Sequence, residues 1–256
     1  MDDLHPGSQA LALEMPAREA AKSLARPMAA EGVGTALLLA IVVGSGIMAD
    51  RLAPAQPAVA LLANGLATAG GLIVLILAFG PLSGAHFNPV VTLVEARRGA
   101  LPWPSVPGYL AAQIAGAFGG VLLAHGMFEV PLVEVSHHAR AGGAQFASEI
   151  VATFGLVLTI LAVSRARAAA TPYAVGLYIL AAYWFTASTS FANPAVTLAR
   201  MVTDTFGGIR PGDAPAFIVA QLVGGALAAG FFRWAWGPAA PGGARRTTRQ
   251  EDGSYS

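Results

Sequence analysis

The fold is decided by a motif that occurs twice, as Phe87-Asn-Pro-Val-Val-Thr-Leu93 and as Ala192-Asn-Pro-Ala-Val-Thr-Leu198. Asparagine is a favoured N-cap and proline a favoured first helical residue, so each Asn-Pro pair predicts the start of a helix. The apolar stretch that follows each pair is about ten residues long. A helix of that length covers about 15 Å, half of a bilayer's hydrocarbon core, so two half-helices are predicted.

Two further landmarks recur in the same order around this motif. Glu31-Gly-Val-Gly-Thr35 is matched by Glu149-Ile-Val-Ala-Thr153, and Ala112-Gln113 by Ala220-Gln221. Three paired landmarks in one order indicate an internal repeat, with repeat one at about 28–128 and repeat two at about 145–236.

The composition indicates a membrane protein. Of the 256 residues 55% are hydrophobic and 11% charged, whereas soluble domains carry about 25% charged residues. Too few polar groups are present to cover a water-exposed surface. The net charge of +1 gives no reason to expect nucleic acid as a partner. The chain has no cysteine, which excludes disulfides and thiolate metal sites, and we predict no cofactor and no metal.

Six segments are apolar enough to be predicted as transmembrane helices. They are Met28–Ala49, Val59–Phe79, Val106–Phe128, Gln145–Val163, Pro172–Ser188 and Ala214–Trp236. The predicted fold class is therefore an all-α membrane protein with six transmembrane helices, two re-entrant half-helices and an inverted internal repeat.

The repeat must be inverted because each half has three spans, an odd number. The two half-helices then enter from opposite faces of the membrane and meet near its midplane. Backbone that does not span is allowed at that depth only where protein buries it or water lines it. A polar path between the two half-helices is expected.

The distribution of basic residues predicts cytoplasmic termini, because basic residues favour the cytoplasmic side. With both termini inside, eleven of the fifteen basic residues lie inside, and only Arg51, Arg140, Arg200 and Arg210 lie outside. Residues 1–26 and 238–256 are predicted to be disordered cytoplasmic tails, since the first has no signal-peptide pattern and the second is rich in Gly, Pro and polar residues. Residues 27–237 form the predicted membrane domain.

The two motif regions, Ser83-Gly-Ala-His-Phe-Asn-Pro-Val-Val-Thr92 and Ala192-Asn-Pro-Ala-Val196, together with Glu31 and Glu149, resemble the aquaporin, or major intrinsic protein, family. The resemblance covers roughly residues 28–236. It implies a passive channel for water and small neutral solutes rather than an enzyme, in a bacterial inner membrane, assembled as a homotetramer with a pore in each subunit. The alternative from the residues themselves is an ion- or proton-coupled secondary transporter, which also uses inverted repeats and broken helices.

The pore constriction is predicted to consist of the two short motifs, Asn88, Pro89, Val90, Asn193, Pro194 and Ala195. If the side-chain oxygen of each asparagine caps its own helix, the NH₂ group is free to donate into the pore. An oxygen that accepts from both asparagines turns its own hydrogens away, which interrupts a proton-conducting chain of water. The positive ends of the half-helices also repel cations.

Three residues are predicted to support the pore loops. Glu31 and Glu149 are acids within the membrane, and such acids are candidates for function. They are either proton relays or, as the resemblance implies, acceptors of hydrogen bonds from the pore-loop backbone, which their equivalent positions in the two repeats favour. The resemblance places His86 beside the pore, either as a pH gate or with a packing or hydrogen-bonding role.

The selectivity filter departs from the family pattern. The resemblance implies an arginine directly after the second motif, where this chain has Val196, and an aromatic residue in the second span, where it has Thr68. Ser190 is a further member, and the fifth-span member is either Ala181 or Tyr183. A ring of small residues without a fixed charge is expected to be wide enough for glycerol, urea or undissociated metalloid acids, including arsenite. Arg200, four residues after Val196, is either a solvated loop residue or a partial replacement for the missing charge.

The remaining polar and small residues are predicted to be structural. His137 and His138 lie in a loop with too few partners for a metal site. A set of glycines is expected to allow close approach between helices, namely Gly116, Gly119, Gly120, Gly224 and Gly225.

Overall fold

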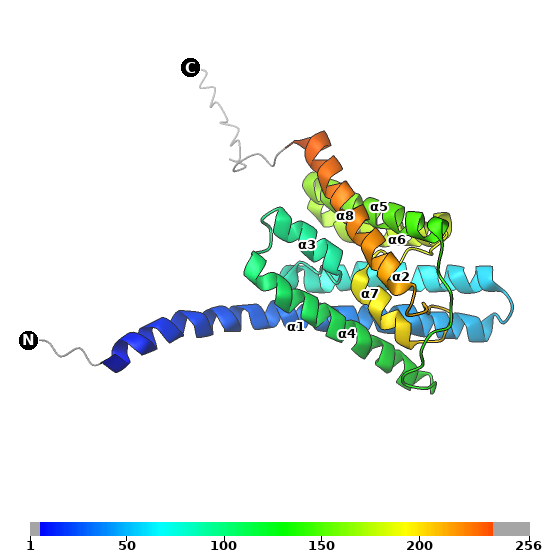
Figure 1. Ribbon diagram of the computed structural model, residues 1–256, viewed down its shortest axis with the longest axis horizontal. Coiled ribbons are helices and arrows are strands. Elements are labelled where there is room, and N and C mark those ends of the chain that lie inside the picture. Colours follow the sequence, from blue (N-terminus) through cyan, green and yellow to red (C-terminus); the bar gives the residue numbers. More distant parts are fainter. Residues whose placement is uncertain (1–5, 238–256) are drawn as a thin grey trace, which may run out of the picture.

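The computed structural model describes residues 6–237, with side chains from residue 24 onward, and this part of the chain contains helices and loops but no strand. Figure 1 shows long helices packed around two short ones. The α-helices are α1 (Pro6–Leu52), α2 (Pro57–Ser83), α3 (Pro89–Arg97), α4 (Val106–Met127), α5 (Gly143–Arg167), α6 (Thr171–Phe185), α7 (Pro194–Ala199) and α8 (Ala214–Trp236). Three 3₁₀ helices are η1 (Trp103–Ser105), η2 (Ala168–Ala170) and η3 (Arg200–Val202).

The two halves of the chain pack in the same way. Helix α1 packs against α2 and α4, and α5 packs against α6 and α8 in the corresponding pattern. The short helices cross between the halves, since α3 contacts α8 and α7 contacts α4, and they also contact each other. Helices α2 and α6 join the two halves along their length. This arrangement confirms the predicted pair of half-helices within a bundle built from a duplicated unit.

Each of the six predicted spans corresponds to a helix, although the fifth, predicted to extend to Ser188, ends at Phe185, and the third, predicted to extend to Phe128, ends at Met127. Within the described residues, five helical stretches are long and apolar enough to cross a membrane, and one of these, Gly143–Phe185, contains the fourth predicted span and most of the fifth. These two spans count as one stretch because η2 connects α5 directly to α6.

The beginning of the chain differs from the prediction. Helix α1 begins at Pro6, so most of residues 1–26, predicted as a disordered tail, belong to the first helix. The reason is local, because six of residues 1–26 are Ala and four are Leu, which are strong helix formers. Its cytoplasmic location remains a prediction. The second predicted tail, residues 238–256, lies outside the described residues.

Glycines allow two pairs of long helices to approach closely. A Cβ atom on Gly116 or Gly120 of α4 would lie less than 3.0 Å from a backbone oxygen of α1, and one on Gly224 of α8 equally close to a backbone oxygen of α5. A Cβ atom on Gly225 would collide with the Val90 side chain of α3. These four glycines therefore have the predicted role. The prediction was wrong for Gly119, which is exposed and would meet nothing within 4 Å.

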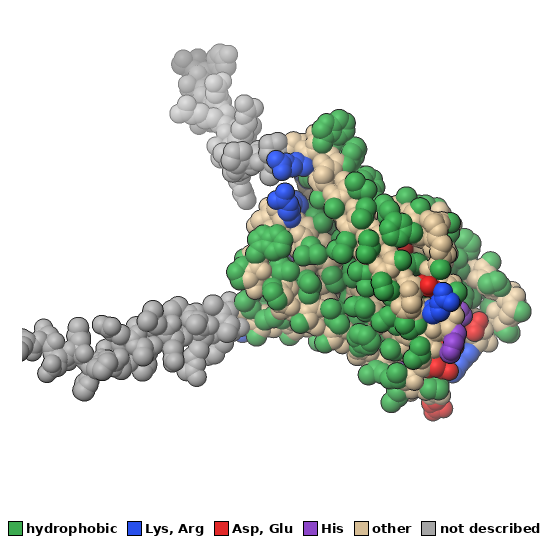
Figure 2. Space-filling model, viewed as in Figure 1, with side chains coloured by type: hydrophobic (Ala, Val, Ile, Leu, Met, Phe, Trp, Pro, Cys, Tyr) green, Lys and Arg blue, Asp and Glu red, His purple; other side chains and the backbone are tan. Residues whose placement is uncertain are grey.

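The outside of the bundle is apolar. Figure 2 shows hydrophobic side chains over most of the visible face, with acidic and histidine side chains gathered mainly at one end. Large apolar residues are exposed on several helices, among them Leu66, Val74, Leu177, Leu227 and Trp234. A contiguous apolar exterior of this extent is unsuited to water and suited to lipid.

Candidate functional site

Both half-helices begin as the motif predicts. Asn88 is the N-cap of α3, and its side-chain oxygen accepts a hydrogen bond from the Val90 N–H at 2.9 Å. Asn193 is the N-cap of α7, and its side-chain oxygen accepts from the Ala195 N–H at 2.9 Å and from the Val196 N–H at 3.3 Å. These bonds satisfy N–H groups that would otherwise have no partner at a helix start.

The two asparagines also hold the half-helices together. The Asn88 Nδ2 donates to the Ala192 carbonyl at 2.7 Å, and the Asn193 Nδ2 donates to the Phe87 carbonyl at 2.7 Å. Each amide thus bonds to the residue that precedes the other asparagine. An amide has two N–H donors, so one remains for the pore. The prediction of a wholly free NH₂ group needs this correction, because the opposing loop comes close enough to accept one hydrogen.

The Glu31 carboxylate supports the first pore loop. One oxygen accepts from the Ser83 hydroxyl at 2.7 Å and the His86 N–H at 2.9 Å. The other accepts from the Phe87 N–H and from the Gln113 side chain, both at 2.7 Å. A buried carboxylate that accepts four hydrogen bonds is typical of a residue that holds the surrounding backbone and side chains in place.

Glu149 repeats this arrangement in the second half. Its two oxygens accept from the Phe191 and Ala192 N–H groups, each at 2.9 Å, and from the Gln221 side chain at 2.6 Å. The geometry of both acids favours the scaffold interpretation over a proton relay.

Two glutamines were missing from the predicted site. Gln113 also donates to the Thr92 hydroxyl at 2.8 Å, and Gln221 to the Thr197 hydroxyl at 2.9 Å. Each glutamine therefore ties a supporting glutamate to a half-helix. The signal that identifies them was present in the sequence, because both glutamines and both threonines belong to the repeated landmarks.

The pore loops have an unusual backbone in both halves. Ala85 and Phe87 have positive φ angles of 50°, and the equivalent Ser190 and Ala192 have 54° and 49°. Residues other than glycine rarely adopt this conformation, which persists where surrounding contacts enforce it. Here the glutamate carboxylates bind the N–H groups on these loops.

His86 lies between the first loop and the start of α3. Its Nδ1 is 3.1 Å from the Thr92 hydroxyl, and its ring packs on Tyr109 with 5.4 Å between ring centroids. These contacts fit the predicted hydrogen-bonding and packing role, and the alternative of a pH gate remains a prediction.

A cavity of about 980 Å³ passes both asparagines. Arg98 lies on its wall at one end, beyond α3, and Arg200 on its wall beyond α7. We refer to these as the Arg98 end and the Arg200 end. Four predicted filter residues line the cavity, namely Thr68, Tyr183, Ser190 and Val196. Of the predicted constriction residues only Asn88 and Asn193 line it; Pro89, Val90, Pro194 and Ala195 are buried behind them.

The structure distinguishes the two alternatives for the fifth span. Ala181 is exposed on the outside of α6, whereas Tyr183 is buried and lines the cavity. The Tyr183 hydroxyl donates to the Thr68 hydroxyl at 3.4 Å, which joins α6 to α2 across the cavity wall. Tyr183 is therefore the residue in a position to act in a filter.

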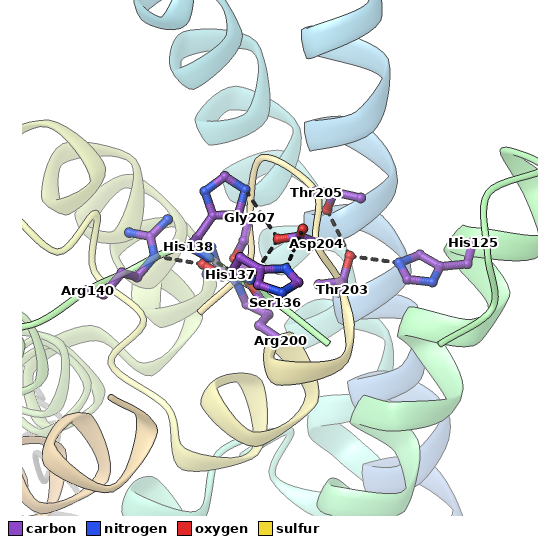
Figure 3. A network of polar contacts seen from close by, with 11 residues as sticks. His125, Ser136, His137, His138, Arg140, Arg200, Thr203, Asp204, Thr205 and Gly207 are labelled. Carbon is purple, nitrogen blue, oxygen red and sulfur yellow. Dashed lines mark hydrogen bonds and ion pairs between the residues drawn. The ribbon is translucent and has the colours of Figure 1, made fainter. Parts of the chain in front are cut away.

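Of the two alternatives for Arg200, the solvated loop residue was wrong, and a partial replacement for the missing charge remains a prediction. Only 4% of it is exposed, and it lines the cavity. Its guanidinium lies 3.5 Å from the centre of the Phe191 ring, and its Nε donates to the Gly207 carbonyl. The segment 131–142 covers this region and brings Arg140 close to it (Figure 3).

The two loop histidines lie beside an aspartate. The Asp204 carboxylate accepts from the His137 N–H at 2.8 Å and lies 3.0 Å from the His137 Nδ1 and 3.9 Å from the His138 Nε2. Hydrogen bonds from the His137 backbone and ring hold the pKa of Asp204 below its ordinary value of 3.8. Within residues 6–237, no cluster of His, Cys, Asp or Glu is suited to a metal ion.

Comparison with known proteins identifies the family of this chain. The model of the family described as "Major intrinsic protein" matches residues 19–186 and 164–253, which together cover most of the chain. The chain belongs to the major intrinsic protein family. Because members of this family are channels, the predicted channel, rather than an enzyme, is confirmed, and the alternative of a coupled transporter is set aside.

Several relatives in the family are similar over most of their length. The aquaglyceroporin AqpS of Rhizobium meliloti (strain 1021) is 56% identical over 85% of this chain and 93% of its own. The aquaporin Z of Bradyrhizobium diazoefficiens is 31% identical over 80% of this chain and 91% of its own. The crystal structure of the aquaglyceroporin from Plasmodium falciparum matches with a TM-score of 0.62 and 24% identity, over 84% of this chain and 98% of that one. This structural match confirms the fold.

Proposed function

We propose that this member of the major intrinsic protein family is a passive channel for neutral solutes larger than water, such as glycerol, urea and undissociated metalloid acids including arsenite, as well as for water. The observation that supports this most directly is the cavity wall, on which Val196 stands where the family resemblance implies an arginine. A small uncharged side chain at that position leaves room for a polyol or a hydroxylated metalloid.

The chemistry of the wall supports the same proposal. The wall combines polar groups from Asn88, Asn193 and Tyr183 with apolar residues such as Leu72 and Ile76. A solute with hydroxyl groups on a carbon or metalloid centre matches such a mixed surface. The similarity to a protein named as an aquaglyceroporin, and to the glycerol uptake facilitator of Streptococcus pneumoniae at 35% identity over 59% of this chain, agrees with it.

The test is a comparison of water, glycerol and arsenite entry into proteoliposomes containing the wild type, Val196→Arg or Val196→Thr. Val196→Thr nearly conserves the side-chain size and is the control. We expect Val196→Arg to lower glycerol and arsenite permeability by about tenfold or more, equivalent to about 1.4 kcal/mol in the barrier, and to lower water permeability less. Equal glycerol permeability in Val196→Arg and the wild type would reject the widened filter.

The assembly and placement of the channel are part of the proposal. We propose a homotetramer in the bacterial inner membrane with both termini in the cytoplasm, so that the Arg200 end faces outward. The distribution of basic residues supports this orientation. Protease accessibility of a C-terminal tag in sealed vesicles tests the orientation, and the mass of the detergent-solubilised complex tests the tetramer.

A further inference from the structure

Two guanidinium groups lie close to one aromatic ring at the Arg200 end of the cavity. The Arg200 guanidinium is 3.5 Å from the centre of the Phe191 ring, and the Arg140 guanidinium is 4.9 Å from the same centre. Arg200 comes from η3, directly after α7, and Arg140 from the segment between α4 and α5. Figure 3 shows both side chains among the contacts that join this segment to the loop after η3.

Neither charge is balanced by a carboxylate. Among the described residues, no aspartate or glutamate oxygen lies within 4.0 Å of either guanidinium. The nearby acids accept other hydrogen bonds: Asp213 accepts from the Arg210 side chain and from the Arg140 backbone N–H, both at 2.8 Å, and Glu149 accepts from the pore loop. Asp204 accepts from His137.

Neutral carbonyl groups hold both arginines in place instead. The Arg140 Nε donates to the Gly208 carbonyl at 2.8 Å and its Nη1 to the Ser188 carbonyl at 3.2 Å, while the Arg200 Nε donates to the Gly207 carbonyl. Carbonyl dipoles and an aromatic face stabilise a cation without cancelling its charge. Among the described residues, the two guanidinium groups at this end of the cavity therefore have no direct ion-pair partner.

Two sets of donors on the cavity wall have no partner in the described structure. The hydrogen bonds of Arg200 involve only its Nε, which leaves the N–H groups of Nη1 and Nη2. The Ser190 hydroxyl is buried without a hydrogen-bond partner, and Ser190 is only 3% exposed. Both residues line the same cavity. At this end the cavity wall therefore offers hydrogen-bond donors from a cationic group and from a hydroxyl to an acceptor oxygen.

We propose that Arg200 and Ser190 form a binding site for the oxygen atoms of small singly charged oxyanions, such as carboxylates and sulfonates, at the Arg200 end of the pore. An oxyanion supplies lone pairs to both donors and a charge to the guanidinium. The charge of Arg200, four residues after Val196, also opposes the entry of cations. Arg140 is a positioning residue that fixes the loop containing Ser188 and Phe191. The inference rests on the proposed function, since it assigns a site within the same pore.

The experiment measures glycerol entry into proteoliposomes with the external salt as either sodium methanesulfonate or sodium chloride at equal ionic strength. Methanesulfonate is a small sulfonate that stays ionised. We expect it to slow glycerol entry into wild-type vesicles at least about twofold relative to chloride, equivalent to half-occupancy of the site. Arg200→Gln and Ser190→Ala are expected to remove most of this inhibition, and Arg200→Lys to retain part of it.

Arg210→Gln is the matched control, because Arg210 lies on the same loop but is exposed and paired with Asp213. It is expected to keep wild-type inhibition. Equal glycerol entry in the two salts for the wild type, or undiminished inhibition in Arg200→Gln, would overturn the proposal. If Arg200→Gln does not fold, Ser190→Ala and Arg200→Lys are used in its place. Inhibition by methanesulfonate at the wild-type level in both of these variants would then overturn the proposal.

The same vesicles separate this inference from the proposed function. A wild type that conducts water but no glycerol would contradict the proposed function alone. The oxyanion site would then be tested by measuring how far methanesulfonate slows water flow through the same variants. The inhibition is again expected to be strongest in the wild type and Arg210→Gln, weaker in Arg200→Lys, and mostly absent in Arg200→Gln and Ser190→Ala.

Discussion

Substituting Gly120 tests the close contact between α4 and α1 that underlies the pore support. A Cβ atom at this position would lie less than 3.0 Å from the Ala36 carbonyl oxygen and from the Leu39 Cβ, whereas ordinary contacts begin at 3.4 Å. Backbone cannot move aside as a flexible side chain can, so α4 must shift away from α1. Overpacking of this kind costs about 1–3 kcal/mol.

Gly119→Ala is the matched control, because Gly119 is the adjacent residue on the same helix and faces open space. Both substitutions gain the same helix propensity, about 0.5–1 kcal/mol, so the difference between them isolates the steric cost. At about 2–4 °C per kcal/mol for a chain of this size, Gly120→Ala should melt about 2–12 °C below Gly119→Ala.

The assay is thermal unfolding of the two purified variants in the same detergent, followed by glycerol entry into vesicles. Helix α1 bears Glu31 and α4 bears Gln113, which are joined by a 2.7 Å hydrogen bond, so separating the helices should also lower glycerol permeability in Gly120→Ala only. Equal melting temperatures for the two variants would refute the close contact at Gly120.

Two further predictions concern the carboxylates. Glu149→Gln leaves one acceptor oxygen for three donors, so at least one buried donor loses its partner. We expect the free energy of unfolding in detergent to fall by about 1–3 kcal/mol and glycerol entry into vesicles to be slower. Glycerol entry at the wild-type rate would contradict the scaffold role. Because the pKa of Asp204 is lowered in the folded protein, its contacts with His137 contribute stability above pH 3.8 and lose it as the pH falls through the lower folded value. The protection factors of segment 131–142, which are exchange rates corrected for the intrinsic rate at each pH, should therefore be similar at pH 7 and pH 5 and fall only below pH 3.8. A fall already between pH 7 and pH 5 would show that another group controls the segment.

The helix starts and the supporting acids could be predicted from the sequence because their signals are local or repeated. Asn88 and Asn193 cap helices by accepting hydrogen bonds from residues two or three positions away. The motif itself contains both partners, so the caps could be predicted from it. Glu31 and Glu149 were identified because the two repeats place them at equivalent positions. The same reasoning applied to Gln113 and Gln221 would have found the rest of the support.

The residues that face the cavity could not be assigned in this way. The choice between Ala181 and Tyr183 depends on how α6 is rotated against α2, and counting from the motif fails because the two repeats differ in loop length. The burial of Arg200 depends on segment 131–142, which lies more than fifty residues earlier in the chain. The Ser136 N–H of this segment donates to Met201 of η3, and the Arg140 side chain donates to Gly208 in the loop after η3.

The sequence by itself determined a membrane-embedded helical bundle with two capped half-helices, since apolar length and capping act within a few residues or along one helix. Only the tertiary structure decided that each asparagine bonds to the opposite loop, that Tyr183 lines the pore and that Arg200 is buried. The physical reason is that these contacts join segments distant in the chain, and which side chains meet is fixed by helix packing rather than by local sequence.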